Sequence, residues 1–537
     1  MAVKVLALCL DSLWQFIIRF TQTSSYWTLT LFPVLIASLL SWRLWRFTIY
    51  PLLHPRDAKE LPYWIPFIGH TFGFFMDSDS TFTRGRLYFK NSRKPFGITV
   101  AGSNIYVLTS AADATAMSKN TRELIFDDYV KGMMASMGSS EAGIIKMWQP
   151  RLPSNIGYPN PLGKPLGQLS EEIFRKQLHP GNHLNELQHK FLSSIHQSLT
   201  AENLWKARPE GKVALSSSPD GKCNVSLLQW IQTTLLEGAT NAFFGEALLA
   251  RNSGLLDNFS EFDERSWQLS YKIPRPWSKK MQMAKQRSLD ALTAYFRSPI
   301  EERPGSCWLV RVMETEMRAA GIEEVDMAAN LMMAYWVING NAWKVCFWIM
   351  AYLVENQDLY SDIRKEVAPM VSIAQSPNTL SDCLDRCPQL VAVYQETLRV
   401  VTSSVSVRNI VSPLELGGKL LQPGNRVLIP YRQILMNEEV FGPNAAYFDA
   451  TRFLRNPSLA KNQSFRPFGS GTTHCPGRFL AQKEVLTFIG IALSRFDIFK
   501  ADRESPFPRL ELKKPCLGIM APVKGEDVEV TVVALRL

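Results

Sequence analysis

One cysteine near the C-terminal end lies in a stretch rich in glycine and proline. Cys475 stands in SFRPFGSGTTHCPGRFLA, residues 464–481, with Gly469, Gly471 and Gly477 around it. Glycine allows positive φ angles and a close approach of the backbone to a flat ligand. A thiolate in such a loop is stabilised by backbone N–H groups and by the start of the helix that follows. The stretch therefore predicts a tight loop that delivers a thiolate to a helix start; the alternative is a buried structural cysteine in a glycine-rich turn.

A second stretch with polar groups in unusual places runs over residues 323–352. It has no proline, begins with acidic residues and is apolar on more than one face, which predicts a long buried helix. Gly340 in its middle costs up to about 1 kcal/mol relative to alanine and so implies a packing or functional reason. Asn339 and Asn341 need hydrogen-bond partners if buried, in an active site or within the helix itself.

Charged residues later in the chain form a third pattern. Glu396 and Arg399 are spaced i, i+3 and so share one helical face, and Arg452 follows in FDATRF, residues 448–453. Between them, residues 405–431 alternate like strands with turns at 417–418 and 423–424. Residues 97–108 alternate in the same way and predict a hairpin. Arg408 falls in the first strand of the 405–431 segment, where the simplest reading is a surface arginine.

The spacing of Phe468, Gly471, Cys475 and Gly477 matches F-x-x-G-x-x-x-C-x-G, and on this motif the chain resembles the cytochrome P450 family. The resemblance implies a mainly α fold with a smaller β part, and haem b bound through the Cys475 thiolate with the other three residues around it. It also implies that Arg408 binds a haem propionate, for which a guanidinium fork is well suited. Where the family often has Arg or His two residues before the cysteine, this chain has Thr473.

The long helix resembles one branch of that family. Residues 338–342, INGNA, align with the family's A/G-G-x-D/E-T, so an amide replaces the acid at Asn341 and a methyl replaces the alcohol at Ala342. Asn341 with the later Phe347-Trp348 resembles the sterol 7α- and 12α-hydroxylases and prostacyclin synthase. Any proton relay must then use Asn341, water or substrate hydroxyls, and Asn341 is the catalytic candidate.

The resemblance assigns two further groups of residues. Glu396, Arg399 and Arg452 would form a buried charge network that holds the scaffold of the cysteine loop. The substrate pocket would be lined by Trp336, Val337, Gly340, Val405 and Ile519. The last of these lies in the C-terminal stretch 515–530, whose tip at 518–521 would close that pocket.

The N-terminal part predicts a membrane anchor. The 17 residues from Tyr26 to Trp42 carry no charge, and their length approaches the lower limit for a bilayer span. Basic residues are more frequent after this run than before it, which places the rest of the chain on the cytoplasmic side. A cleaved signal peptide is the rival reading, and the role of residues 1–20 stays open. Residues 1–60 are thus predicted to form the membrane anchor and the segment that leads to the hinge, and residues 61–537 one haem-thiolate catalytic domain.

Composition agrees with one large body and limits its partners. The net charge of +10 on 537 residues is spread along the chain, which disfavours nucleic acid and suits an anionic membrane surface or an acidic protein. The eight cysteines are scattered without metal-ligand spacing, so zinc is not expected and reduced thiols are. A basic footprint for a redox partner would comprise Arg452, Arg455, Lys461, Arg466, Arg478 and Lys483.

The function implied by the resemblance is that of a haem-thiolate monooxygenase. It would oxidise a large apolar substrate, steroid- or terpenoid-like and in secondary metabolite biosynthesis, with O₂ and electrons from NADPH-cytochrome P450 reductase. It would be a single-pass protein of the endoplasmic reticulum membrane with a cytosolic catalytic domain. A haem-thiolate isomerase or dehydratase without NADPH is the first alternative. A membrane-tethered haem carrier or sensor and a non-haem structural protein are the others.

Overall fold

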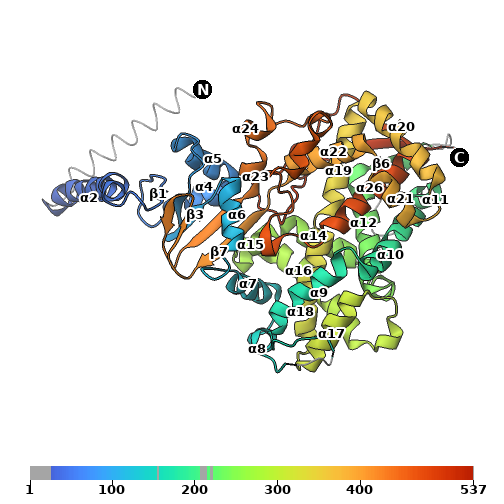
Figure 1. The fold of residues 1–537 in the computed structure, drawn as a ribbon, viewed down its shortest axis with the longest axis horizontal. Coiled ribbons are helices and arrows are strands. Elements are labelled where there is room, and N and C mark those ends of the chain that lie inside the picture. Colours follow the sequence, from blue (N-terminus) through green and yellow to red (C-terminus); the bar gives the residue numbers. More distant parts are fainter. Residues whose placement is uncertain (1–25, 154–156, 206–213, 218–221, 536–537) are drawn as a thin grey trace.

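The computed structural model describes residues 26–153, 157–205, 214–217 and 222–535. Helices make up most of the regular structure of the described residues and three sheets the remainder, as predicted (Figure 1). The helical body carries one large apolar core to which helices throughout the chain contribute. A β-rich part lies at one side of this body, between it and the N-terminal helix (Figure 1).

The larger sheet has six strands in the order β1-β2-β3-β10-β7-β4. Their bounds are β1 Lys59–Glu60, β2 Phe96–Val100, β3 Ser103–Val107, β4 Leu124–Ile125, β7 Val405–Ile410 and β10 Arg426–Pro430. The predicted hairpin is β2 and β3, which pair antiparallel. Its turn needs the left-handed backbone at Gly102, where φ is +77°. The antiparallel pairing of β7 with β10 places Arg408 opposite Val427.

Two smaller sheets complete the β structure. β8 (Leu414–Leu416) and β9 (Lys419–Leu421) pair across the predicted turn at Gly417-Gly418. The four-stranded sheet has the order β11-β12-β6-β5, with bounds Phe496–Lys500, Glu529–Ala534, Lys222–Ser226 and Ala214–Ser217. Because β6 leads directly into helix α12, this sheet holds the C-terminal segment beside the start of that helix.

The helices that surround the core come mostly from the middle of the chain. Their bounds are α6 Ala111–Lys119, α7 Asp127–Met137, α8 Glu141–Trp148, α9 Leu166–Leu178, α10 Asn182–Ser198, α12 Leu227–Phe244, α14 Leu255–Arg265, α16 Arg275–Arg297 and α17 Trp308–Ala319. After the long central helix come α20 Gln357–Ile373, α21 Pro377–Leu384, α22 Pro388–Val401, α25 Arg452–Arg455 and α26 Arg478–Arg495.

The long central helix is divided in two, which corrects the prediction of one continuous helix over 323–352. α18 runs over Glu324–Asn339 and α19 over Ala342–Glu355. The break falls at Gly340 and Asn341, and Asn341 leaves helical geometry with φ −128° and ψ −46°. Its side-chain Oδ1 accepts a hydrogen bond from the backbone N–H of Ile519, 3.0 Å away, so a contact with a distant segment stabilises the break.

The predicted anchor is helical. α2 spans Tyr26–Leu44 and continues into a π-helical turn, η1, at Trp45–Ile49, and the helix stands apart from the main body (Figure 1). Phe32, Val34 and Leu35 on this helix are exposed. Within the described residues, length and composition single out one helical stretch that could cross a membrane, Glu324–Glu355, and it is mostly buried in the core.

The connector after the anchor, residues 61–70, contains Pro62 and Pro66, which predict an extended course. The structure corrects this prediction, because the connector is not extended throughout. Phe67 has φ +67°, and the N–H of Gly69 donates to the carbonyl of Ile65 at 3.0 Å. Pro66 therefore lies within a turn, and Pro62 precedes it.

Candidate functional site

Cys475 lies between a 3₁₀ turn, η4 (Gly471–Thr473), and the start of α26. Its N–H donates to the carbonyl of Phe468 at 3.0 Å, which closes the loop, and Nη1 of Arg478 donates to its carbonyl at 2.8 Å. Burial raises the pKa of the Cys475 thiol, while the N–H of Gly477 and the Arg478 cation act in the opposite direction. The helix begins at Arg478, so Pro476 precedes it by two residues instead of forming its first turn.

Two glycines of the loop have conformations that other residues adopt poorly. Gly469 has φ +76° and Gly471 φ +69°, and a Cβ on Gly471 would come within 2.2 Å of Cβ of Ser118. Gly477 has an ordinary negative φ, and a Cβ there would lie 3.7 Å from Sγ of Cys475. The glycines of the motif thus set the shape of the loop at two positions and leave space beside the sulfur at the third.

Arg408 on β7 is brought to this loop by the tertiary structure. It is 7% exposed, Nη2 donates to Oγ1 of Thr473 at 2.7 Å, and the guanidinium lies 4.5 Å from the ring centroid of Phe126. Among the described residues no carboxylate forms an ion pair with it, and burial lowers its pKa. A buried guanidinium without an acid is costly.

These residues fit a haem. Cys475 would ligate the iron, and Arg408 with Thr473 would bind a propionate, which supplies the missing carboxylate. Two residues of the predicted substrate pocket have open space beside them: Val337 on α18 is 54% exposed and Val405 on β7 46%, although the neighbouring residues of α18 are largely buried.

The structure places the other predicted pocket residues, Ile519, Gly340 and Trp336, in separate contacts. Ile519 is buried, and its N–H is bound by Asn341, so the 518–521 tip is fastened to the break between α18 and α19. A Cβ on Gly340 would lie 2.8 Å from the carbonyl of Trp336, which is the packing reason for a glycine there. Trp336 is 2% exposed and donates from Nε1 to Oδ1 of Asp263 at 2.9 Å.

The predicted charge network is close-packed and buried. Glu396 accepts from Nε and Nη2 of Arg399 at 2.9 and 2.7 Å, and from Nε of Arg452 at 3.1 Å. The N–H of Asp449 also donates to it at 2.9 Å. Arg399 further donates to the carbonyls of Ala445 and Tyr447, and through these contacts α22 holds the segment that precedes the cysteine loop.

Asp263 is a residue that the sequence did not single out. It lies at the end of α14, is 9% exposed, and accepts from Trp336 and, at Oδ2, from Nζ of Lys344 at 2.8 Å. Trp336 and Lys344 stand on opposite sides of the helix break. Lys344 within an apolar helix signals that a buried acid is required, but nothing local in the sequence identifies which one.

Comparisons with known proteins point to the same family as the cysteine motif. The family model for cytochrome P450 matches residues 344–530. A cytochrome P450 monooxygenase, poxD, of Penicillium oxalicum is 23% identical over 475 residues, 86% of this chain and 91% of that protein. The 7-alpha-hydroxycholest-4-en-3-one 12-alpha-hydroxylase of Oryctolagus cuniculus is 24% identical and covers 88% of this chain and 93% of its own. Human prostacyclin synthase is 26% identical over 239 residues, 40% of this chain and 47% of its own.

A solved structure shows the same fold. Cyanobacterial CYP120A1 with retinoic acid bound superposes with a TM-score of 0.66 at 16% identity, and the match covers 89% of this chain and 99% of that one. This fold and the cysteine loop are those expected of a haem-thiolate protein. The chain resembles the cytochrome P450 family over the residues that the family model matches, and its relatives include sterol hydroxylases and prostacyclin synthase. It is an enzyme of the monooxygenase class that these relatives represent.

Proposed function

We propose that this enzyme is a monooxygenase that hydroxylates or oxidises a large apolar substrate of steroid or terpenoid type, in secondary metabolite biosynthesis. The observation that carries the proposal is the Cys475 loop with the buried Arg408 beside it, which has no ion pair among the described residues and suits a haem propionate. The name of the fungal monooxygenase supports the reaction type, and the name of the sterol 12-alpha-hydroxylase supports the substrate class.

The bound haem would supply O₂ activation, and the residues of the chain would arrange the reactants around it. Cys475 would hold the iron, and Arg408 would orient the ring through a propionate. Val337 and Val405 would offer apolar walls, and Ile519 would close the pocket while its N–H stays on Asn341. A closed apolar pocket excludes water and strengthens the electrostatic interactions inside it.

Electrons would come from NADPH through the membrane-bound cytochrome P450 reductase. The expected basic footprint is smaller than the sequence indicates, because Arg452 is buried with Glu396, and Lys483 is paired with Asp382 and Asp385. Arg455 is paired with Asp449 as well. Lys461, Arg466 and Arg478 then remain as the docking candidates, and α2 would hold the enzyme on the endoplasmic reticulum membrane with its body in the cytosol.

A haem-thiolate isomerase or dehydratase is the second candidate. Ala342 has no hydroxyl, and Oδ1 of Asn341 is occupied by the N–H of Ile519, so the two positions of the family's acid-alcohol pair offer little for proton delivery. An enzyme that rearranges an already oxygenated substrate does not need that delivery. Turnover of a steroid and terpenoid panel by microsomes with and without NADPH separates the two: product that forms without NADPH supports the isomerase.

The ligation of haem by Cys475 is tested by spectroscopy. Reduced protein with carbon monoxide should show the Soret band of thiolate ligation, and Cys475→His should abolish it because imidazole donates less electron density to the iron. Cys383→Ser, at a half-buried cysteine on α21, is the matched control and should keep the band. A wild-type spectrum of the histidine-ligated kind would refute the proposal.

A further inference from the structure

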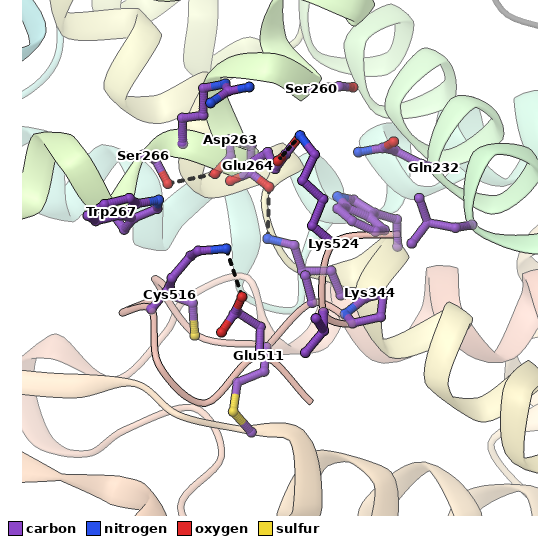
Figure 2. A pocket seen from close by; sticks show the side chains of 18 of the residues that line it. Gln232, Ser260, Asp263, Glu264, Ser266, Trp267, Lys344, Glu511, Cys516 and Lys524 are labelled. Carbon is purple, nitrogen blue, oxygen red and sulfur yellow. Dashed lines mark hydrogen bonds and ion pairs between the residues drawn. The ribbon is translucent and has the colours of Figure 1, made fainter. Parts of the chain in front are cut away.

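A cavity of about 530 Å³ lies beside the helix break (Figure 2). Its walls are the start of α12, the end of α14, the first turn of α19 and the C-terminal segment 511–527. This volume is in the range of small-molecule sites. The 516–520 side of the cavity is held in place, since Nε1 of Trp348 donates to the carbonyl of Met520 at 2.8 Å.

The charges around the cavity exclude an anionic ligand. Each cation that lines it is already paired with an acid: Lys344 with Asp263 at 2.8 Å, Lys514 with Glu511 at 2.7 Å, Lys524 with Glu264 at 2.7 Å and Arg265 with Glu261 at 3.5 Å. Figure 2 shows the first and third of these pairs. Asp527 adds a further acid to the lining, as does Glu526, which is paired with Arg509. A carboxylate or phosphate would therefore meet a net negative wall.

Two hydrogen-bond donors are available for a neutral ligand instead. Trp343 lines the cavity and is 5% exposed, and its Nε1 has no hydrogen-bond partner. A buried donor without an acceptor costs free energy, so an acceptor brought by a ligand would be favourable. Lys344 is 6% exposed and has three N–H groups, of which the bond to Asp263 uses one. Its Nζ lies 5.1 Å from the ring centroid of Trp343, so the two donors are neighbours.

We infer that this cavity binds the hydroxyl or carbonyl end of a neutral, largely apolar molecule, with Nε1 of Trp343 and Nζ of Lys344 as donors. Trp267, Leu517 and Met520 supply apolar lining for the body of the ligand. Met520 and Ala521 of the 518–521 tip line the cavity, and Ile519 of the same tip is a residue of the proposed substrate pocket, so the tip borders both. This inference rests on the proposed function, since it describes the polar end of that steroid- or terpenoid-like substrate.

The test compares ketones with the matching hydrocarbons. Equilibrium dialysis of the full-length holoprotein in detergent measures the affinity for androstanone against androstane, and for the triterpenoid friedelin against friedelane. Trp343→Phe keeps an apolar ring and removes only the donor, so it should weaken ketone binding about fivefold and leave hydrocarbon binding unchanged. Trp308→Phe, at an indole that stacks on His183 outside the cavity, is the matched control and should change neither.

A second variant tests the role of Lys344 as a hydrogen-bond donor to the ligand. Lys344→Gln with Asp263→Asn removes both charges together, which avoids an unpaired buried ion. It should weaken ketone binding and still not strengthen binding of the anionic probe etianic acid. Ketone affinity that does not respond to Trp343→Phe, equal affinity for ketone and hydrocarbon, absence of binding, or tighter binding of etianic acid than of androstanone would each overturn the inference.

Dialysis does not depend on the chemistry at the haem, so the two proposals fail separately. Ketone binding that depends on Trp343, without O₂-dependent product, leaves the inference standing and refutes the monooxygenase. If oxidised product forms but Trp343→Phe leaves the ketone affinity unchanged, the monooxygenase proposal stands and the inference about the cavity is refuted.

Discussion

Asn341 acts on the structure through one hydrogen bond, to the N–H of Ile519 at 3.0 Å. Asn341→Leu removes the acceptor, and its larger branched side chain crowds Gly518, where a Cβ would already lie 2.9 Å from Oδ1. We expect haem content to be unchanged and product per NADPH to fall roughly fivefold to tenfold, because the buried donor is left unpaired and the tip moves. The ratio of product formed to NADPH consumed measures this.

The control for Asn341 keeps the acceptor oxygen. Asn341→Asp, alone or with Ala342→Thr, should retain the coupling of NADPH to product or improve it, since the pair restores the family's acid and alcohol. Coupling that Asn341→Leu does not lower would show that neither proton delivery nor the position of the tip depends on this side chain.

Asp113 on α6 gives a pH dependence at the residue scale. It is 6% exposed, and burial raises its pKa from 3.8 to about 6. The unfolded chain then loses this proton at lower pH than the folded one, so the contribution of Asp113 to stability is fully present below pH 3.8 and is lost as pH rises through about 6. The Asp113→Asn side chain cannot ionise. Between pH 4 and pH 7 the free energy of unfolding of this variant should therefore rise by about 1–3 kcal/mol relative to that of the wild type.

Denaturant unfolding of both proteins at several pH values checks this, and the difference between them removes the contributions of all other groups. A stability difference that stays constant from pH 4 to pH 7 would contradict the raised pKa.

At the scale of elements, the charge network joins α22 to α25 and the segment between them. Arg452→Met leaves buried Glu396 with Arg399 as its remaining cation, and we expect a loss of about 3–5 kcal/mol in the free energy of unfolding. Arg455→Met, three residues on, is the matched control: its side chain is 65% exposed and its pair with Asp449 should contribute at most about 1 kcal/mol. Urea unfolding at neutral pH measures the free energy of unfolding of both variants. Equal losses would mean that burial of the network adds nothing to the stability of the fold.

The break between α18 and α19 is also an element-scale feature. Asp263 binds Trp336 on one side and Lys344 on the other, while Asn341 binds the 518–521 tip from the break itself. α14, the central helix and the C-terminal segment therefore meet at one point. A change at any of these contacts should be felt in both the substrate pocket and the neighbouring cavity.

At the scale of the whole molecule, α2 stands apart from the body and exposes Phe32, Val34 and Leu35. Deletion of residues 1–45 should move most of the protein from the membrane to the soluble fraction after centrifugation, because the apolar run is lost. Deletion of residues 1–20 alone is the control and should leave the protein in the membrane fraction. Full-length protein that is soluble without detergent would refute the anchor.

The sequence by itself determined the features that depend on local residue order. The glycines at 469 and 471 specify their positive φ values, the pair at 417–418 specifies a hairpin turn, and alternation specifies β2, β3 and β7. The cysteine motif indicated the family whose model matches residues 344–530. These features could be predicted because neighbours in the chain decide them.

Only the tertiary structure decided which distant groups meet. The helix break at Gly340 and Asn341 involves a contact with Ile519, 178 residues away; the sequence marked Gly340 as unusual but indicated neither the break nor this partner. The same holds for Asp263 and Lys344, separated by 81 residues, and for Arg408 and Thr473, separated by 65. The physical reason is that a buried polar group must find a partner, but its own neighbours do not determine where in the chain that partner lies.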